Sequence, residues 1–188
     1  MLESKESIRT AMKAAFAKID KIEHQKISQQ LHKVLFASDL WKNAETIGTY
    51  LSIGTEWDTR AIVDQALAEG KKVTVPKTDH KTKALVFYEM TDWSQILKDG
   101  YFGLDEPNPE MTSPIDKNAI NLLLVPGLVF TRNGYRVGFG GGYYDRYLKD
   151  FIHPTVSLVH TNQFVDNFQI EPFDIPVHYL VTEEGIVR

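Results

Sequence analysis

The chain has 188 residues, of which 43% are hydrophobic and 24% charged, values that are ordinary for a soluble globular protein with a substantial core. Its net charge of −4 excludes a whole-protein attraction to nucleic acid or to an anionic membrane, and the absence of cysteine excludes disulfides, thiolate nucleophiles and cysteine metal sites. The polar amino terminus carries no apolar signal core, and no stretch approaches about 20 apolar residues, so we expect a cytoplasmic protein that binds neither membrane nor nucleic acid.

Helical and strand-like patterns alternate through the first half of the chain. Asp58 or Thr59 can cap one of the helices, and Gly70 ends it. The spacing of apolar residues predicts helices over residues 4–20, about 27–35, 59–69 and 93–98. Short β-prone runs predict strands over residues 46–53, 72–75 and 84–89.

The second half begins with a predicted loop over residues 100–114, which is rich in proline and carboxylates. The apolar run at 122–125 is typical of a strand buried on both faces, and Asn133-Gly134 predicts the turn of a hairpin. The hairpin strands are predicted at 128–132 and 135–139, and two later strands at 155–160 and 179–182. This alternation predicts one α/β domain over residues 1–188, with an open, mostly parallel sheet flanked by helices that binds ligands at the carboxyl ends of its strands.

A glycine-rich segment is the most informative motif. Gly138, Gly140, Gly141 and Gly142 fall within five residues, and a helix is predicted to open at Asp145. Glycines that lead into a helix aim backbone N–H groups and a positive dipole end at one point, which suits a phosphate. The spacing matches neither a P-loop nor a dinucleotide-binding fingerprint, and the alternative is a surface turn between a strand and a helix.

The pattern Arg-x-Gly-x-Gly-x-Gly-Tyr-Tyr-Asp, from Arg136 to Asp145, closely resembles the signature of the 5-formyltetrahydrofolate cyclo-ligase family, also called 5,10-methenyltetrahydrofolate synthetases. Weaker matches follow in the family's order over nearly the whole chain. They are Lys5-x-x-x-Arg9, Leu51-Ser-Ile-Gly-Thr-Glu56-Trp-Asp-Thr59, Val75-Pro76-Lys77, Glu106-Pro107 and Val125-Pro126-Gly127. The resemblance implies a fold similar to the ribose-phosphate isomerase and CoA-transferase group.

The resemblance also implies a reaction. ATP phosphorylates the formyl oxygen of 5-formyltetrahydrofolate, the folate N10 attacks the activated carbon, and loss of phosphate leaves 5,10-methenyltetrahydrofolate with ADP as the other product. Phosphoryl transfer depends on positioning and on neutralising charge, so we expect cations, backbone donors and Mg²⁺ rather than a protein nucleophile.

The resemblance assigns a set of residues to ATP, and three of these also to catalysis. Lys5 and Arg9 share one helix face, which without the family is more often a solvated face, and Arg136 has the alternative of a cross-strand partner. The two tyrosines have the alternative of core packing. The ATP set is Lys5, Arg9, Arg136, Gly138, Gly140, Gly141, Gly142, Tyr143 and Tyr144, and the catalytic set is Arg136, Tyr143 and Tyr144.

The folate set implied by the resemblance centres on Glu56, because a carboxylate pairs well with the donor edge of a pterin. In general a glutamate in such a place is more often an exposed turn residue. The full set is Ile53, Glu56, Glu106, Phe139, Gly140, Gly141, Gly142 and Tyr143.

Asp145 is the predicted Mg²⁺ ligand, because it is a hard oxygen donor beside a phosphate loop; its alternative is to stabilise its own helix. The chain departs from the family at His178, where an aspartate is common, so a second protein ligand is in doubt and Asp174 or water is the substitute. The other histidines (His24, His32, His80, His153 and His160) have no metal spacing and are interpreted as structural or exposed.

Two other functions remain open from the residues alone. A sugar-phosphate isomerase of related fold would use the glycine loop for its substrate's phosphate and would need a carboxylate base but no ATP. A non-catalytic nucleotide- or folate-binding module would bind ATP without consuming it. The sequence leaves the oligomeric state open.

Overall fold

A computed structural model describes residues 3–98, 100 and 103–188. Its centre is one eight-stranded sheet, in which the pairings from β11 through β10, β7 and β1 to β2 are parallel and the outer pairings are antiparallel. The strands in spatial order are β12 (Gly185–Val187), β11 (Tyr179–Thr182), β10 (Thr155–Leu158), β7 (Leu122–Leu124), β1 (Thr46–Gly48), β2 (Lys72–Asp79), β3 (Ala84–Met90) and β6 (Ser113–Pro114). The predicted open, mostly parallel α/β sheet is confirmed.

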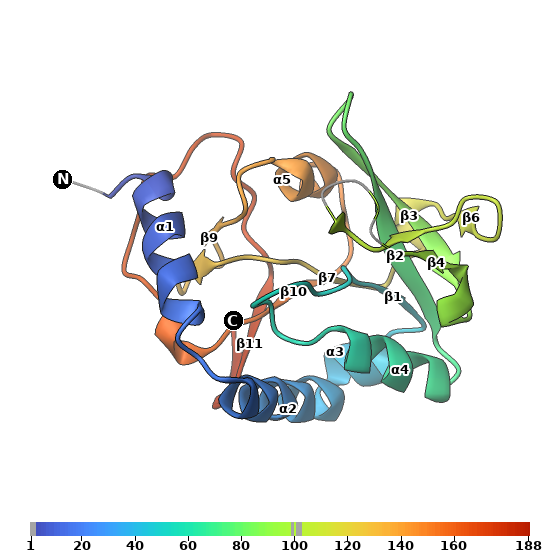
Figure 1. The fold of residues 1–188 in the computed structure, drawn as a ribbon, viewed down its shortest axis with the longest axis horizontal. Coiled ribbons are helices and arrows are strands. Elements are labelled where there is room, and N and C mark those ends of the chain that lie inside the picture. Colours follow the sequence, from blue (N-terminus) through green and yellow to red (C-terminus); the bar gives the residue numbers. More distant parts are fainter. Residues whose placement is uncertain (1–2, 99, 101–102) are drawn as a thin grey trace.

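Helices cover both faces of this sheet (Figure 1). Leu122 and Leu124 of β7 pack into the cluster formed with α2, α3 and α4, whereas Leu123 packs into the cluster formed with α5. Since neighbouring residues of a strand point to opposite faces, β7 is buried on both, as its apolar run predicted. The helices are α1 (Lys5–Phe16), α2 (Lys21–Ala37), α3 (Asp39–Asn43), α4 (Arg60–Ala68) and α5 (Tyr143–Leu148).

A small hairpin beside the main sheet carries the glycine segment. Its strands are β8 (Val129–Phe130) and β9 (Arg136–Val137), and α1 packs against both. Gly134 in the turn has φ 85°, a conformation that favours glycine and explains the Asn-Gly signal. Phe130 bridges to Phe164, which follows β10, so the hairpin lies at the carboxyl ends of the central strands.

Several predicted boundaries were wrong. The strand predicted at 46–53 ends at Gly48, because the backbone at Tyr50 and Ser52 then bonds to side chains, chiefly Thr59, instead of a neighbouring strand. The helix predicted at 4–20 ends at Phe16, and Asp20 caps α2 instead. The helix predicted to open at Asp145 begins two residues earlier, at Tyr143.

Short elements account for the other differences. The helix predicted at 93–98 is one 3-10 turn (η1, Trp93–Gln95) followed by β4 (Ile96–Leu97). The predicted loop at 100–114 contains β5 (Glu106–Pro107), which pairs with β4, and β6; its residues 101 and 102 lie outside the described residues. Two further 3-10 turns are η3 (Lys117–Ala119) and η4 (Thr161–Gln163). Over the described ranges, no helix has the length and apolar character needed to cross a bilayer.

Candidate functional site

The glycine segment forms a turn between β9 and α5. Gly140 has φ 106° and Gly142, the residue before α5, has φ 67°, and both values lie where an L side chain is strained. Gly141 is required for another reason: a Cβ there would lie 2.5 Å from the ring of Tyr143. The glycines therefore let the backbone turn sharply and let an aromatic ring lie directly on it.

Arg136 and Asp145 close this loop from its two ends. The Arg136 guanidinium is buried and donates from Nη1 to the Ile175 carbonyl (2.6 Å) and from Nη2 to Asp145 Oδ1 (3.1 Å). The backbone N–H of Ile175 donates to the same carboxylate oxygen at 3.1 Å. Burial lowers the pKa of Arg136, and the Asp145 carboxylate opposes that effect.

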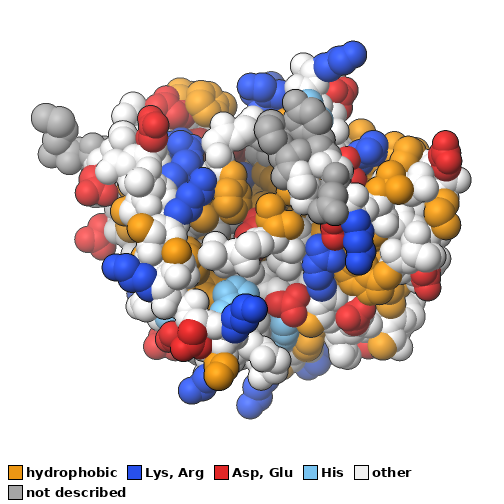
Figure 2. All heavy atoms as spheres, in the orientation of Figure 1, with side chains coloured by type: hydrophobic (Ala, Val, Ile, Leu, Met, Phe, Trp, Pro, Cys, Tyr) orange, Lys and Arg blue, Asp and Glu red, His pale blue; other side chains and the backbone are white. Residues whose placement is uncertain are grey.

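Helix α1 presents cations to the loop. Arg9 donates from Nε to the Gly138 carbonyl at 2.7 Å, and Lys5 forms an ion pair with Asp174. Figure 2 shows Lys and Arg side chains gathered over this helix, beside a hollow in the same face. A further cation on α1, Lys13, lies over the exposed ring of Phe139 at 5.9 Å.

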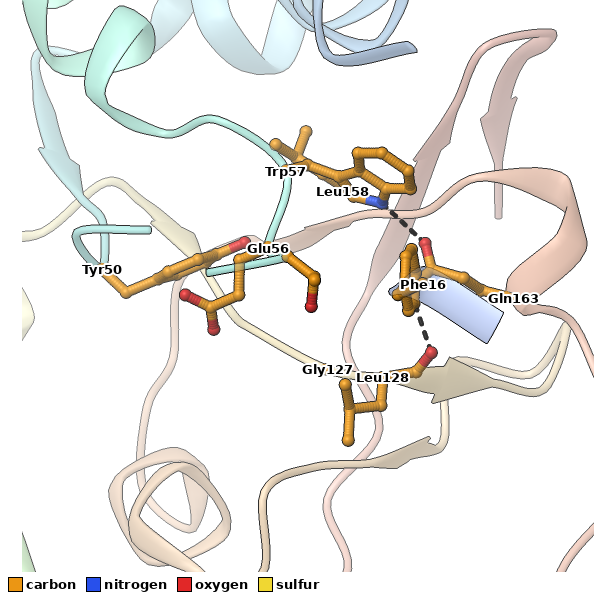
Figure 3. A pocket seen from close by; sticks show the side chains of 9 residues that line it. Phe16, Tyr50, Glu56, Trp57, Gly127, Leu128, Leu158 and Gln163 are labelled. Atoms are coloured by element: carbon orange, nitrogen blue, oxygen red, sulfur yellow. Dashed lines mark hydrogen bonds between the residues drawn. The ribbon is translucent and has the colours of Figure 1, made fainter. Parts of the chain in front are cut away.

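A pocket opens at the carboxyl ends of β1, β7 and β10. Its wall is fixed by Gln163, which accepts from Trp57 Nε1 at 2.7 Å and donates to the Leu128 carbonyl at 2.9 Å (Figure 3). The two ends of the Gln163 amide therefore join segments that follow three different strands. The pocket is lined by Phe16, Tyr50, Thr55, Glu56, Trp57, Gly127, Leu128, Leu158 and Gln163.

Glu56 is the charged group of this pocket, and it is poorly compensated. Its Oε2 accepts from the Ile53 backbone N–H at 2.8 Å, yet burial raises the pKa of Glu56 from 4.5 to about 7. Its side chain lies beside the ring of Tyr50 (Figure 3), and burial, together with this carboxylate, raises the pKa of Tyr50. Burial and the same carboxylate also raise the pKa of Tyr144, so the three groups influence one another electrostatically.

Tyr144 also carries an unpaired hydroxyl. It is one of two buried side-chain polar atoms that have no hydrogen-bond partner in the described part of the chain. Arg136 acts on Tyr144 electrostatically in the opposite direction, lowering the pKa that burial and Glu56 raise. Tyr144 is thus influenced both by the pocket carboxylate and by the cation beside the loop.

The remaining predicted residues have different surroundings. Ile53 and Phe139 are exposed, at 40% and 49%. Glu106 is buried and already bonded, to Lys77 Nζ at 3.0 Å and to Thr78. The hydroxyl of Tyr143 contacts His80 Nδ1 at 3.2 Å.

His178 lies away from the glycine loop. It precedes β11, and its Nδ1 accepts from the backbone N–H of Thr155 at the start of β10 (3.1 Å). The amino ends of parallel strands form the edge opposite to the pocket. No cluster of three or more His, Asp or Glu side chains that could hold a metal occurs among residues 3–98, 100 and 103–188.

A model of the 5-formyltetrahydrofolate cyclo-ligase family matches residues 1–183 of this chain. The chain belongs to this family. Its activity is that of a 5-formyltetrahydrofolate cyclo-ligase, or methenyltetrahydrofolate synthetase: an ATP-dependent ligase that acts on folate. The family implies 5-formyltetrahydrofolate and ATP as its substrates.

Two relatives and one solved structure match over more than nine tenths of their lengths. The 5-formyltetrahydrofolate cyclo-ligase of Haemophilus influenzae is 25% identical over 178 residues, covering 93% of this chain and 95% of that one. A probable 5-formyltetrahydrofolate cyclo-ligase of Caenorhabditis elegans is 29% identical over 192 residues, with 96% and 93% covered. The solved structure of Aquifex aeolicus 5,10-methenyltetrahydrofolate synthetase superposes with a TM-score of 0.86 at 26% identity, covering 98% of this chain and 92% of that one.

Sequence reasoning missed several residues that shape the site. Trp57 directly follows Glu56 in the segment that resembles the family, so a role for Trp57 in the site could have been predicted from its position. Tyr50 and Gln163 had no such signal, because each reaches the pocket only through the fold. His80 was interpreted as structural or exposed, yet it contacts Tyr143.

Proposed function

We propose that ATP binds between α1 and the glycine loop, that 5-formyltetrahydrofolate binds in the Glu56 pocket, and that the formyl group meets the γ-phosphoryl group beside Tyr143 and Tyr144. The observation that carries this layout is the buried Tyr144 hydroxyl, which is unpaired among the described residues and on which both Glu56 and Arg136 act electrostatically. An unpaired buried hydroxyl costs roughly 1–3 kcal/mol, and a ligand group that bonds to it recovers this free energy.

The ATP side is proposed to consist of α1 and the loop backbone. Lys5 and Arg9 lie four residues apart on one helix face and both reach the segments around the loop. The N–H groups of Gly138, Gly140, Gly141 and Gly142 are the proposed backbone donors. Phosphate oxygens would exchange with the present partner of Lys5, Asp174, so nucleotide binding replaces one ion pair with another.

Arg136 is proposed to act through its charge. Both of its donating nitrogens bond to protein groups, and its side chain is 4% exposed. The fixed positive charge of Arg136 favours binding of an anion at the glycine loop, because the protein interior screens charge weakly. A direct bond from Arg136 to phosphate stays a prediction.

The folate side is proposed to centre on Glu56, whose carboxylate pairs with the N–H edge of the pterin. The exposed side chains of Ile53 and Phe139 are the proposed apolar contacts. Glu106 is the exception in the predicted folate set, since its oxygens already accept from Lys77 and Thr78. We propose that it acts at a distance from the folate.

In the proposed reaction the formyl oxygen forms a bond to the γ-phosphorus as the bond to the ADP oxygen breaks. The folate N10 then bonds to the formyl carbon, phosphate leaves with the former formyl oxygen, and N10 loses its proton. The cations of α1 and Arg136 neutralise charge on the transferring group, and the pocket holds the pterin so that N10 reaches the carbon.

Mg²⁺ is part of the proposal. Both hydrogen bonds that Asp145 accepts from the described part of the chain go to Oδ1, which fits a role for Oδ2 as a metal ligand. A single carboxylate suits Mg²⁺ when substrate phosphates and waters supply the other oxygens. When bound there, Mg²⁺ would neutralise charge on the ATP phosphates.

The cytoplasmic location and the lack of membrane and nucleic-acid partners remain proposals. One relative, from Arabidopsis thaliana, is a mitochondrial 5-formyltetrahydrofolate cyclo-ligase, 24% identical over 213 residues. Family membership is therefore compatible with more than one compartment, and fractionation of cells followed by immunodetection tests the proposal.

The test is a spectrophotometric assay of methenyl formation with purified protein. We expect absorbance to rise only when 5-formyltetrahydrofolate, ATP and Mg²⁺ are all present, and to stop when a chelator is added. Turnover of equal rate without ATP, or without a divalent cation, contradicts the proposal. Each substrate alone should also raise the melting temperature, because a ligand that binds only the folded state stabilises it.

A further inference from the structure

A chain of three hydrogen bonds links a buried carboxylate to the hydroxyl of Tyr143. Thr78 Oγ1 lies 2.5 Å from Glu106 Oε1, His80 Nε2 lies 3.1 Å from Thr78 Oγ1, and the Tyr143 hydroxyl lies 3.2 Å from His80 Nδ1. The chain runs from β5 through the end of β2 to the first residue of α5. It therefore connects the strand side of the fold to the glycine loop.

The donors and acceptors of this chain have one consistent direction when the His80 imidazole is neutral. An ionised carboxylate only accepts, so the single hydroxyl proton of Thr78 goes to Glu106. Thr78 Oγ1 then has only lone pairs for His80, which must donate from Nε2. A neutral imidazole with its proton on Nε2 has a bare Nδ1, and this nitrogen accepts from the Tyr143 hydroxyl.

The carboxylate end of the chain is firmly held in its ionised form. Glu106 Oε2 accepts from Lys77 Nζ at 3.0 Å, and Oε1 also accepts from the Thr78 backbone N–H at 3.1 Å. Burial alone would raise the pKa of Glu106, but the bonds from Thr78 and Lys77 outweigh burial and lower it. The direction of the chain is thus set at Glu106.

The tyrosine end is equally constrained. The ring of Tyr143 lies on the backbone of Gly141, where no side chain would fit. The His80 ring meets the Tyr143 ring edge-on, with centroids 6.4 Å apart and an interplanar angle of 79°. The hydroxyl proton is therefore directed at His80, and only the oxygen lone pairs remain for a ligand.

We propose that His80 is a positioning residue that fixes the Tyr143 hydroxyl as a hydrogen-bond acceptor, so that its ligand partner is an N–H donor of the folate and not an ATP phosphate. This inference rests on the proposed function. Phosphate oxygens offer only acceptors, and a hydroxyl whose proton is held by His80 cannot donate to them. Glu106 and Thr78 act on the substrate only through this chain.

The decisive experiment compares two variants that each keep one of the bonds of His80 to Thr78 and Tyr143. In His80→Asn the side-chain oxygen takes the place of Nδ1 and still accepts from Tyr143, whereas His80→Gln keeps a donor for Thr78 and loses that acceptor. We expect kcat/KM for folate to fall roughly three- to tenfold in His80→Gln and to stay within about twofold in His80→Asn, as one hydrogen bond predicts. KM for ATP should change little in both.

Tyr143→Phe should match His80→Gln, and the double variant should lose no more than either alone. His153→Gln is the control, since His153 contacts only the Asn118 carbonyl and the Phe151 ring among its described contacts. Equal losses in His80→Asn and His80→Gln, with equal falls in melting temperature, overturn the inference in favour of a structural role. A loss confined to KM for ATP overturns it as well.

Nitrogen-15 NMR of the histidines in the unliganded parent tests the direction of the chain without turnover. We expect the protonated Nε2 tautomer for His80; a protonated Nδ1 or an imidazolium overturns the inference. If Tyr143→Phe is as active as the parent while Glu56→Gln is not, the inference fails and the proposed folate pocket survives. If the parent protein shows no ATP-dependent turnover, both the proposed function and the inference are wrong.

Discussion

The glycine loop and the Glu56 pocket satisfy their polar groups in opposite ways. Around the loop, each of Lys5 and Arg136 already has a carboxylate partner, Asp174 and Asp145 respectively. Among the described residues, Glu56 of the pocket has only a backbone donor and a raised pKa, and the Tyr144 hydroxyl has no partner. Two of the three cations at the loop, Lys5 and Arg136 but not Arg9, are thus paired with carboxylates without substrate, whereas the pocket carboxylate has no cation partner among the described residues.

This difference indicates where ligands stabilise the fold. Nucleotide binding at the loop exchanges the Lys5–Asp174 ion pair for a new one, so its net gain in stability is small relative to the number of contacts formed. A folate that bonds to Glu56 would compensate a charge that burial now penalises. We therefore expect folate to raise the melting temperature more than ATP does at equal saturation.

Replacement of Glu56 gives the largest expected effect. A folded-state pKa of about 7, raised from 4.5, means that the protein loses stability as pH rises through this window, because the folded state must give up a proton it holds more tightly. The loss is on the order of 3 kcal/mol once Glu56 is ionised. Glu56→Gln should therefore be more stable than the parent above pH 7, and should bind folate poorly.

The measurement is a pair of denaturant titrations at pH 5 and pH 8, with KM for folate and ATP from the methenyl assay. The exposed Glu45 supplies the control Glu45→Gln. If the difference in stability between the parent and Glu56→Gln is the same at both pH values, Glu56 ionises without a cost in stability. The contrast between the two regions would then disappear.

The next largest effect is expected at α1. Lys5→Ala and Arg9→Ala should each raise KM for ATP, with about 1.5–3 kcal/mol lost per charge-assisted contact, and should change KM for folate much less. Lys18→Ala is the control, because Lys18 is an exposed lysine just beyond the end of α1. A rise in KM for folate alone would move both cations to the folate side.

Some features of the fold and the site could be predicted from local sequence patterns, and others could not. The strand at 122–125 and the glycine turn were predictable because each pattern is local: an unbroken apolar run, and glycines where φ is positive. Lys5 and Asp174 are 169 residues apart, and His80 and Tyr143 are 63 apart, so no local pattern links them. Only the family resemblance predicted that Lys5, Arg9 and Glu56 bind the substrates of one reaction. It did not predict a role for Gln163.

A smaller effect is expected at the metal. Asp145→Asn should raise the Mg²⁺ concentration needed for half-maximal activity roughly tenfold, because a neutral amide is a weaker ligand for a hard cation. It should also destabilise the fold, since it leaves the buried Arg136 without its counter-charge. His178→Ala is the control, because His178 lies at the opposite edge of the sheet; its loss should not shift the Mg²⁺ titration. If His178→Ala shifts the Mg²⁺ titration and Asp145→Asn does not, the metal binds near His178 and not at Asp145.

The smallest effect, and the sharpest test of the contrast, is expected from Tyr144→Phe. The change removes only a hydroxyl that is buried without a partner, so the unliganded protein should gain up to about 1 kcal/mol of stability or stay unchanged. Tyr147→Phe, on the same helix, is the matched control.

With both substrates bound, the order of stability should reverse, because the parent hydroxyl then has a ligand to bond while the Tyr144→Phe variant has none. A melting-temperature series without ligand, with folate, with ATP and with a non-hydrolysable ATP analogue plus folate separates these states. If Tyr144→Phe destabilises the unliganded protein by as much as it weakens ligand binding, the hydroxyl already has a partner in the free protein, and the contrast between the pocket and the loop is lost.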